Sequence, residues 1–519
     1  MLAPFCNEPM TDFSNPTQIK AFEAALSKVE SWLGRTYPMV IGGEKIYTDE
    51  TFDSLNPANP SQVVARFARA TPEHANRAVE VAHDAFHEWR KVPYETRARY
   101  LFKLAELIRK RKHEFSAIMV YEVGKSWPEA DADTAETIDF CDYYARQMLR
   151  LGGAQPVEPF AGRDAELRYI PLGVGVVIPP WNFPGAIMAG MTAASLVTGN
   201  TVVLKPASTS PWIAWFLSEM LYEDLRLPPG VLNFLPGPGG KMGDALVDHP
   251  LTRHIAFTGS KEIGLRIFQR AAVQQPGQKW LKRTLLEMGG KDAILVDESA
   301  DLDAAADAIV ASAFGFQGQK CSACSRAILV EDVYDEVVDK VVRRAAKITV
   351  GPTIDPAHWM GPVVDAKAYA KMWEYIETGT QEGKLLLGGQ PLSHNPTNGY
   401  FVPPTIFGDI DRNARLAQEE IFGPVLACIK AKSFEDGLDV ANGTEYGLTG
   451  AIFSRHRARL ERAREDFHVG NLYLNRKCTG ALVGVEPFGG FNMSGTDSKA
   501  GGADYLLLFT QAKVISEAI

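Results

Sequence analysis

The sequence predicts an α/β protein with two parallel-sheet domains, and three observations favour this class. The chain has 519 residues, 46% of them hydrophobic, which is enough for two or three units with separate cores. Short runs rich in Val, Ile and Leu alternate with helical patterns, and turns rich in Gly, Pro or Ser separate them. This alternation is typical of βαβ crossovers, which make the strands of a sheet parallel.

Long helix patterns come first. Ala, Val, Leu and Ile recur at three- and four-residue spacing in residues 72–92, 95–115 and 129–150. The basic run 109–113 lies near the end of the second pattern. We interpret it as a solvated helix end rather than as a binding patch.

A first series of strands follows, at residues 173–178, 201–204, 231–235 and 254–257. The longest apolar region, residues 172–204, is interrupted by prolines and asparagines. We therefore expect strand, loop, helix and strand in a protein core there, and no membrane span.

A second series begins near residue 293. Its strands are expected at residues 293–296, 327–330 and 426–429, and helices at 302–316 and 334–348 alternate with them. Ligands of such sheets bind outside the carboxyl ends of the strands. We expect the site in the crevice between the two domains.

Composition excludes several classes of function. The net charge of −9 offers no electrostatic footprint for nucleic acid. Six cysteines at irregular positions do not form a disulfide framework, which favours a reduced, cytoplasmic compartment. The N-terminal residues lack the basic segment and long apolar stretch of a secretory signal.

The segment 318–326 carries Cys321 and Cys324, and Glu287 lies upstream in residues 286–291. A thiolate can add to a carbonyl carbon, and a carboxylate can activate the water that releases the product. A buried structural cysteine, or a redox or zinc half-site, is the alternative. No second cysteine pair or paired histidines accompany the segment, so we expect no metal.

Two glycine-containing turns are candidate cofactor sites. Residues 237–243 follow an expected strand, but their G-x-G-x-x-x-G spacing is a weak signal for a dinucleotide. The turn 257–264 places Ser260 at a helix N-terminus, where free amides favour a phosphate. An ordinary capped helix is the alternative. With the cysteine and the carboxylate, these turns indicate oxidation of an aldehyde by a nicotinamide cofactor.

Taken in order, the motifs resemble the aldehyde dehydrogenase family, from about Tyr37 almost to the C-terminus. They are residues 178–184 (IPPWNFP), 204–207 (LKPA), 257–260 (FTGS), 286–291 (LEMGGK), 318–326 (GQKCSACSR), 419–424 (EEIFGP) and 487–490 (PFGG). The resemblance implies two Rossmann-like domains and a small β-flap for oligomerisation. It places an NAD-binding domain at residues 1–150 and 170–286, a catalytic domain at 287–498, and the flap at 151–169 and 499–519.

The resemblance also implies catalytic roles. Cys321, which follows Gly-Gln-Lys, matches the nucleophile, and Asn182 matches the donor to the oxyanion, together with the Cys321 backbone N–H. Loss of one such donor costs roughly 3–4 kcal/mol. Glu287 matches the base that hydrolyses the thioester. A turn asparagine and a solvated carboxylate are the alternative interpretations of Asn182 and Glu287.

NAD is the cofactor that the resemblance implies. Lys205 matches a contact to the adenosine ribose, Ser260 one to the pyrophosphate, Glu420 one to the nicotinamide ribose, and Phe422 a support of the nicotinamide ring. Ser208 stands where many NAD-preferring members carry a glutamate, so we expect NADP to be used more weakly than NAD. The full predicted set is Ile178, Pro179, Pro180, Trp181, Lys205, Ala207, Ser208, Gly239, Gly243, Phe257, Thr258, Gly259, Ser260, Gly264, Glu287, Met288, Gly289, Glu420 and Phe422.

The C-terminal run 479–502 resembles the branch of the family that oxidises L-glutamate γ-semialdehyde. This implies an aromatic box of Phe183 and Phe488 around the substrate stem. Ser322, Gly480 and Ala481 would anchor an α-carboxylate with a hydroxyl and loop amides. Glu136 matches a carboxylate near the substrate, although a solvated helix face is an equal alternative. Core packing is the default interpretation of both phenylalanines.

The resemblance thus implies NAD-dependent oxidation of L-glutamate γ-semialdehyde, formed from 1-pyrroline-5-carboxylate, to glutamate in proline breakdown. An aldehyde dehydrogenase acting on another ω-semialdehyde is one alternative, and a non-catalytic structural protein on the same fold is another. A homodimer or higher homo-oligomer is expected. A separate proline dehydrogenase is a candidate partner.

Overall fold

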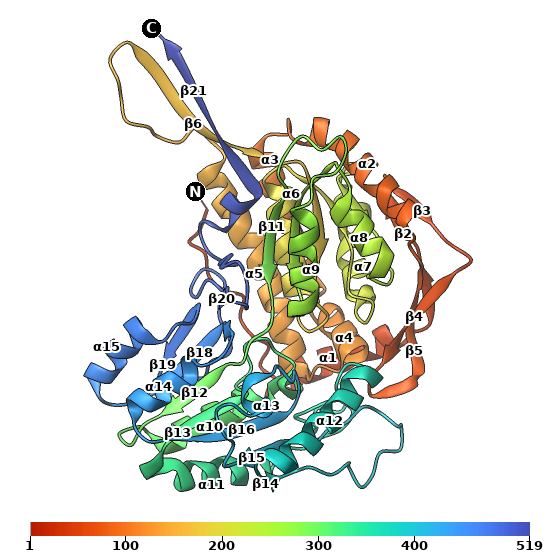
Figure 1. Ribbon diagram of the computed structural model, residues 1–519. Coiled ribbons are helices and arrows are strands. Elements are labelled where there is room, and N and C mark those ends of the chain that lie inside the picture. The colour runs from red at the N-terminus through yellow and green to blue at the C-terminus, as the bar shows by residue number, and fades with distance from the viewer. Residues whose placement is uncertain (1) are drawn as a thin grey trace.

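The computed structural model describes residues 2–519 and confirms the α/β class. Two seven-stranded sheets form the framework, one in the upper part and one in the lower part of Figure 1. Each sheet is mainly parallel and carries helices on both faces. A two-stranded ribbon protrudes from the body at the top.

The first sheet matches the first predicted series of strands. Its parallel part runs from β11 to β9, and two antiparallel strands from the N-terminal region extend it beyond β9. In spatial order its strands are β11 (Arg283–Glu287), β10 (Thr252–Thr258), β7 (Val174–Ile178), β8 (Thr201–Leu204), β9 (Leu232–Phe234), β2 (Met39–Ile41) and β3 (Glu44–Ile46).

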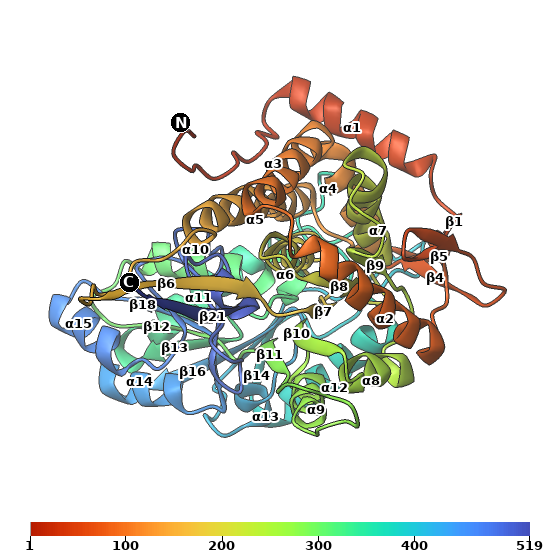
Figure 2. The ribbon, with the colours of Figure 1, turned by 90° about the horizontal axis from the view of Figure 1, so that it is seen from above.

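Helices cover both faces of this sheet because its strands alternate apolar side chains between two cores. On one face lie α2 (Pro72–Trp89), α8 (Gly240–Asp248) and α9 (Lys261–Ala271). On the other lie α6 (Ala186–Val197) and α7 (Pro211–Glu219). Figure 2 shows an outer layer beyond α6, made of α1 (Pro16–Glu30), α3 (Tyr94–Lys110), α4 (Lys112–Val123) and α5 (Trp127–Leu151).

One predicted helix is wrong. The pattern at residues 95–115 is two helices, because Arg111 leaves the helical region with φ −112° and ψ 23° between α3 and α4. The residues of α4 from Phe115 to Val123 are all buried, so its apolar side chains show no single face. Because α4 has no single apolar face, the sequence pattern did not show that a new helix begins after Arg111.

The second sheet is built in the same way. Its strands, in spatial order, are β14 (Lys384–Leu387), β15 (Thr405–Gly408), β16 (Val425–Ala431), β13 (Arg326–Val330), β12 (Ala293–Val296), β18 (Thr449–Phe453) and β19 (Asn471–Leu474). Only β14 is antiparallel to its neighbour. The helices α10 (Leu302–Phe314) and α11 (Tyr334–Ala345) cover one face. The other carries α12 (Ala366–Glu382), α13 (Arg415–Gln418), α14 (Phe434–Asn442) and α15 (Arg457–Asp466).

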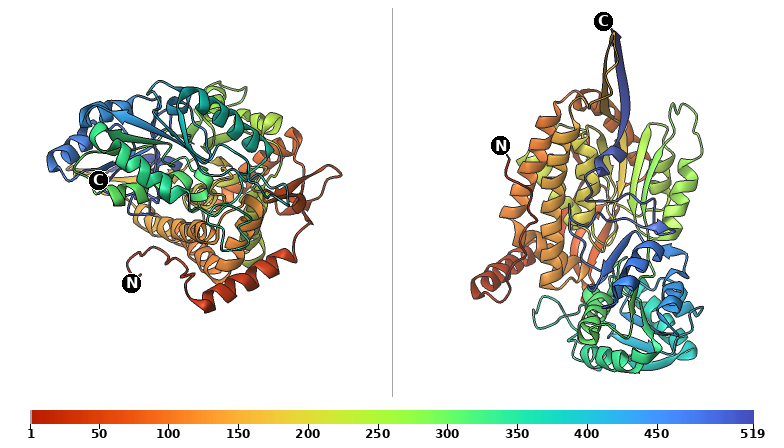
Figure 3. Two further views of the ribbon diagram at one scale, coloured as in Figure 1. Left: turned by 90° about the horizontal axis from the view of Figure 1, so that it is seen from below. Right: turned by 90° about the vertical axis from the view of Figure 1, so that its left-hand side faces the viewer.

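The protruding ribbon pairs β6 (Arg163–Pro171) with β21 (Thr510–Ala518). Figure 3 shows that it stands clear of the body in a second view. Residues 505–509 form a short 3-10 helix that packs in the core of the first sheet, so the ribbon itself begins only after them. The smaller elements are β1 (Arg35–Tyr37), β4 (Thr51–Asn56), β5 (Asn59–Ala68), β17 (Tyr446–Gly447) and β20 (Phe491–Asn492). The division into domains remains a prediction.

Among residues 2–519, no helix is long and apolar enough to cross a membrane.

Candidate active site

The carboxyl ends of the first sheet form one wall of a cavity of about 370 Å³. Parallel strands end at the same edge, so Ile178 of β7, Lys205 after β8 and Thr258 of β10 come together there. The second sheet supplies Cys321 and the 420–422 loop. The lining residues are Ile178, Pro179, Pro180, Trp181, Asn182, Lys205, Ala207, Phe257, Thr258, Gly259, Ser260, Ile263, Met288, Gly289, Cys321, Lys371, Glu420 and Phe422.

Cys321 lies on the loop between α10 and β13, and a strained turn precedes it in the sequence. Phe316 and Gln317 have φ values of 48° and 56°, which side-chain-bearing residues seldom adopt. Such conformations cost about 1–3 kcal/mol each and persist only where surrounding contacts fix them. The Gln317 amide supplies two of these contacts, since it donates to the carbonyls of Gly124 at 3.1 Å and Pro362 at 2.8 Å. The rest of the fold therefore sets the position of the nucleophile loop.

Burial raises the pKa of the Cys321 thiol well above its usual range, and the carboxylates of Asp292, Glu420 and Glu287 raise it further. In this environment the neutral thiol is the favoured form. A nucleophile here therefore needs a base to take its proton, or a positive charge in the cavity to stabilise the thiolate.

Asn182 is buried and lines the same cavity as Cys321. Its Nδ2 donates to the Gln319 carbonyl at 3.0 Å. A side-chain amide has two N–H donors, so this bond orients the group and leaves one hydrogen for an acceptor in the cavity. The structure thus brings the predicted oxyanion donor to the nucleophile loop.

Glu287 ends β11 and lines a second, smaller cavity of about 50 Å³ with Cys321 and Phe488. Its Oε1 accepts from the Ser498 hydroxyl at 2.5 Å and the Ser498 amide at 3.3 Å, and Oε2 accepts from the Gly490 amide at 3.3 Å. Burial raises its pKa to about 7, although these hydrogen bonds act in the opposite direction. A carboxyl group with that pKa can accept and release a proton at neutral pH.

The cofactor side of the cavity offers donors and one carboxylate. Lys205 is buried, its Nζ donates only to the Pro206 carbonyl at 3.1 Å among the described residues, and burial lowers its pKa to about 8. Ser260 caps α9 by accepting from the Ile263 amide at 3.4 Å. Ser260 and Ile263 line the cavity, so the first turn of α9 lies at its wall. The free amides of such a turn are what a phosphate site requires.

Glu420 and Phe422 line the cavity from the loop between α13 and β16. Glu420 accepts from the Gly290 amide at 3.1 Å. A Cβ atom at position 289 would come within 2.2 Å of its carboxylate, so a larger residue there would displace the Glu420 side chain. Phe422, with φ 63°, packs edge-to-face on Trp181 at 5.5 Å between ring centroids.

Five predicted cofactor residues do not line this cavity: Ser208, Gly239, Gly243, Gly264 and Glu287, of which Glu287 lines the smaller one. The Ser208 hydroxyl donates to the Gly237 carbonyl at 3.2 Å. At Gly264 a Cβ would lie 2.4 Å from the Met288 sulfur, so this glycine allows α9 to pack closely. Their cofactor roles remain predictions.

Sequence reasoning missed Lys371, whose Nζ lines the cavity and donates to the Glu420 carbonyl at 2.9 Å. It lies within the amphipathic pattern of α12, where nothing distinguishes it from a surface lysine.

On the substrate side, the acidic helix α5 faces inward. Lys125 and Asp133 form a fully buried ion pair with 2.9 Å between Nζ and Oδ2, and the Lys125 ammonium lies 4.1 Å from the centre of the Phe183 ring. Glu129 pairs with Lys320, the residue before Cys321, at 2.7 Å. Glu136 is half-buried, and burial together with Asp133 raises its pKa to about 8. Of these residues, sequence reasoning predicted Phe183 and Glu136 and missed the contacts of Lys125, Asp133, Glu129 and Lys320.

The predicted carboxylate anchors are brought together at the second sheet. The buried Ser322 has a carbonyl that accepts from the Cys478 thiol at 3.4 Å, and Cys478 precedes the loop of Gly480 and Ala481. Arg476 fixes that loop by donating to the Thr479 and Gly480 carbonyls at 3.0 and 3.1 Å.

Within residues 2–519, no group of three or more His, Cys, Asp or Glu side chains is arranged to hold a metal ion.

Comparisons with known proteins agree with this geometry. The sequence profile of the aldehyde dehydrogenase family matches residues 46–515, and the chain belongs to that family. Among its relatives, a 1-pyrroline-5-carboxylate dehydrogenase from Geobacillus sp. (strain WCH70) is 60% identical over 517 residues, which cover 100% of both chains. A solved 1-pyrroline-5-carboxylate dehydrogenase from Thermus with bound NAD has 50% identity and a TM-score of 0.97 over 100% of both chains. Proline utilization A from Bdellovibrio bacteriovorus has 46% identity and a TM-score of 0.97, over 99% of this chain and 53% of that one.

Proposed function

We propose that the protein oxidises L-glutamate γ-semialdehyde, formed from 1-pyrroline-5-carboxylate, to L-glutamate with NAD⁺ in proline breakdown. The observation that carries this proposal is the placement of Cys321, Asn182 and Glu420 in one cavity, with Glu287 beside it. Full-length relatives bear the name of that enzyme. The likeness to a structure with bound NAD supports the cofactor.

The residues of the cavity fit NAD⁺. The α9 N-terminus and Ser260 suit a pyrophosphate, Lys205 retains free donors for a ribose, and Glu420 can accept from ribose hydroxyls. Phe422 and Trp181 provide aromatic surface for the nicotinamide. When bound, the nicotinamide supplies a positive ring that accepts a hydride.

In the first half of the reaction, the Cys321 thiol releases its proton to solvent, and the thiolate adds to the aldehyde carbon to form a thiohemiacetal anion. The aldehyde oxygen becomes negative in this step. It accepts hydrogen bonds from the Asn182 amide and the Cys321 backbone N–H, which stabilise the charge. Loss of the hydride from the same carbon leaves a thioester on Cys321.

Glu287 acts as the base in the second half of the reaction, the hydrolysis of the thioester. With its pKa near 7, the carboxylate takes a proton from water, and the resulting nucleophile attacks the thioester carbon. Glutamate leaves and the Cys321 thiolate is regenerated. The Ser498 and Gly490 donors hold the base while it does so.

Selection of the substrate rests on the anchors around Ser322. Its hydroxyl and the amides of Gly480 and Ala481 would bind the α-carboxylate, and Phe183 and Phe488 would flank the aliphatic stem. We also propose a cytoplasmic location, a homodimer or larger homo-oligomer joined through the β6–β21 ribbon, and a separate proline dehydrogenase as a partner.

The experiment that tests this function compares NADH production from 1-pyrroline-5-carboxylate with that from simple aldehydes and other ω-semialdehydes. We expect kcat/KM for the glutamate semialdehyde to exceed the others. A higher value for another ω-semialdehyde would assign that substrate instead.

A further inference from the structure

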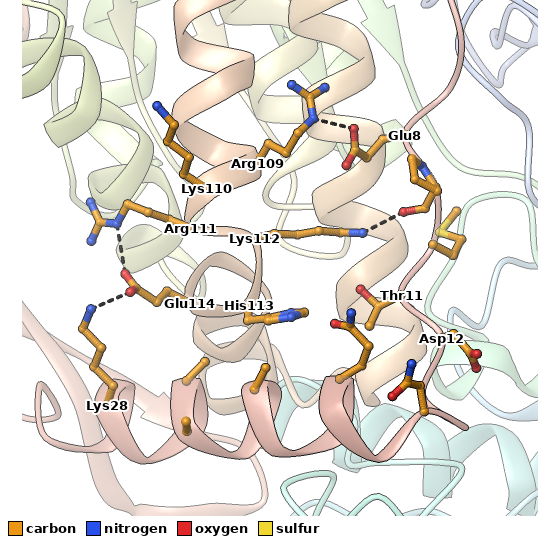
Figure 4. Close-up of a pocket in the computed structure, with 17 residues that line it drawn as sticks. Glu8, Thr11, Asp12, Lys28, Arg109, Lys110, Arg111, Lys112, His113 and Glu114 are labelled. Carbon is orange, nitrogen blue, oxygen red and sulfur yellow. Dashed lines mark hydrogen bonds and ion pairs between the residues drawn. The ribbon is translucent and has the colours of Figure 1, made fainter.

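The N-terminal arm, defined here as residues 2–15, lies along α5 before α1 begins. The Thr11 amide and hydroxyl donate to the Asp131 carboxylate at 2.7 and 2.6 Å. The Glu8 amide donates to Asp139 at 2.7 Å, and the Glu8 carboxylate pairs with Arg109 at 2.8 Å. Figure 4 shows Glu8, Thr11 and Asp12 on the arm, with the Glu8 carboxylate directed at Arg109 near the end of α3. The arm is therefore fixed to the helical layer at several points.

Asn7 makes a different kind of contact, because it joins two separate parts of the fold. Its Nδ2 donates to Asp139 of α5 at 2.8 Å and to the carbonyl of Val483 at 3.0 Å. Val483 lies two residues after Ala481, on the loop that carries the proposed carboxylate anchors. Both hydrogens of one amide group thus link α5 to the anchor loop.

Phe5 reinforces the same junction. Its ring packs edge-on against Tyr143 of α5 with 5.0 Å between centroids. At Gly484, which has φ +79°, a Cβ would lie 3.3 Å from the Phe5 ring and 3.0 Å from Tyr143. The arm therefore contacts the anchor loop at two adjacent residues, 483 and 484.

The two parts that Asn7 joins both carry predicted substrate residues. Through Glu129, Asp133 and Glu136, α5 approaches Lys320 and Phe183, while the loop presents Gly480 and Ala481. Arg476 holds the loop on its second-sheet side. On its α5 side, the side-chain hydrogen bond comes from Asn7.

We propose that Asn7 is a positioning residue for substrate recognition: it fixes the distance between the anchor loop and α5, and so sets affinity for an α-carboxylate. This inference rests on the proposed function. Without Asn7, the buried Val483 carbonyl loses its side-chain donor, and the loop shifts to find another partner. Amides that bind a carboxylate need a fixed geometry, whereas attack of Cys321 on the aldehyde does not depend on them.

The test uses the full chain with Asn7→Ala, and Thr11→Val as the matched control. Thr11→Val removes one arm contact to α5 but none to the loop. For Asn7→Ala we expect KM for glutamate semialdehyde to rise about tenfold, with kcat, KM for pentanal and Kd for NAD⁺ changing less than about twofold. Thr11→Val should leave all four values unchanged.

An equal rise of KM in Asn7→Ala and Thr11→Val would overturn the proposal, since loosening of the arm alone would then explain the weaker binding of substrate. An unchanged KM for the semialdehyde in Asn7→Ala would also overturn it, and so would equal rises of KM for pentanal and the semialdehyde. Should Asn7→Ala not fold, Asn7→Ser replaces it: this smaller polar residue has one hydroxyl hydrogen and cannot donate to both Asp139 and Val483, and the same outcomes decide. Failure of the proposed function is distinct, because the wild-type protein would then show no preference for the semialdehyde.

Discussion

Replacing Glu287 by glutamine tests whether this carboxylate acts only in the second half of the reaction, the hydrolysis of the thioester. Gln is nearly isosteric, and its oxygen can still accept from Ser498 at the position where Oε1 now does so at 2.5 Å. The loop around residues 488–498 should therefore keep its place. The change removes the ability to take a proton from water, and it replaces Oε2 by an NH2 group that cannot accept from the Gly490 amide.

The size of the effect follows from that loss. Positioned general bases contribute roughly 10²–10⁴-fold, so kcat should fall by about that factor. The first hydride transfer does not need this base and should persist. Because burial raises the pKa of Glu287 to about 7, the wild-type kcat should increase as pH rises through about 7, where the carboxyl group loses its proton. Glu287→Gln should lack this inflection.

Rapid mixing of Glu287→Gln with NAD⁺ and substrate measures NADH directly. A burst of about one NADH per active site should precede a slow steady rate. Mass spectrometry of the quenched protein should find the acyl group on Cys321. Absence of both the burst and the acyl group would show that Glu287 does not serve hydrolysis, and a retained inflection near pH 7 would assign that pKa to another group.

Three further substitutions test other parts of the site. Cys321→Ala should abolish turnover while calorimetry still detects NAD⁺ binding, and retained activity would exclude the thioester route. Ser322→Ala should raise KM for glutamate semialdehyde much more than for pentanal; equal changes would argue against a carboxylate site. Ser208→Glu should lower kcat/KM for NADP⁺ and spare that for NAD⁺, because a carboxylate repels the 2′-phosphate. If the wild-type protein already rejects NADP⁺ as strongly, Ser208 does not set the preference.

Strand positions were predictable because buried parallel strands are short apolar runs. The strands β8 and β12 match residues 201–204 and 293–296 as expected. Helix ends were harder. The break at Arg111 falls inside a continuous run of good helix formers, and only the tertiary packing of α4 requires it.

The site residues that could be predicted are those within ordered motifs, such as Cys321 and Asn182. The missed ones act through partners that no local motif connects. Asp133 meets Lys125 and also accepts from the Ala186 amide at 2.6 Å, so it fixes the loop of Phe183. An isolated acidic helix pattern suggests a solvated face, and only the fold shows that this carboxylate is buried and paired.

The charges around Cys321 also explain how a thiol can lie among carboxylates and still serve as a nucleophile. Burial, Asp292 and Glu420 raise its pKa, so in the free protein the sulfur keeps its proton and is a poor target for oxidation. Of these groups, Glu420 also lines the adjoining cavity, where an ionised carboxylate favours a cation, and a nicotinamide is one. Binding of that cation lowers the cost of the thiolate at the moment when an acceptor for the hydride is in place. On the proposed mechanism, Glu420 therefore has opposite effects before and after the cofactor binds: it raises the pKa of the thiol in the free protein, and it favours binding of the positive ring that stabilises the thiolate.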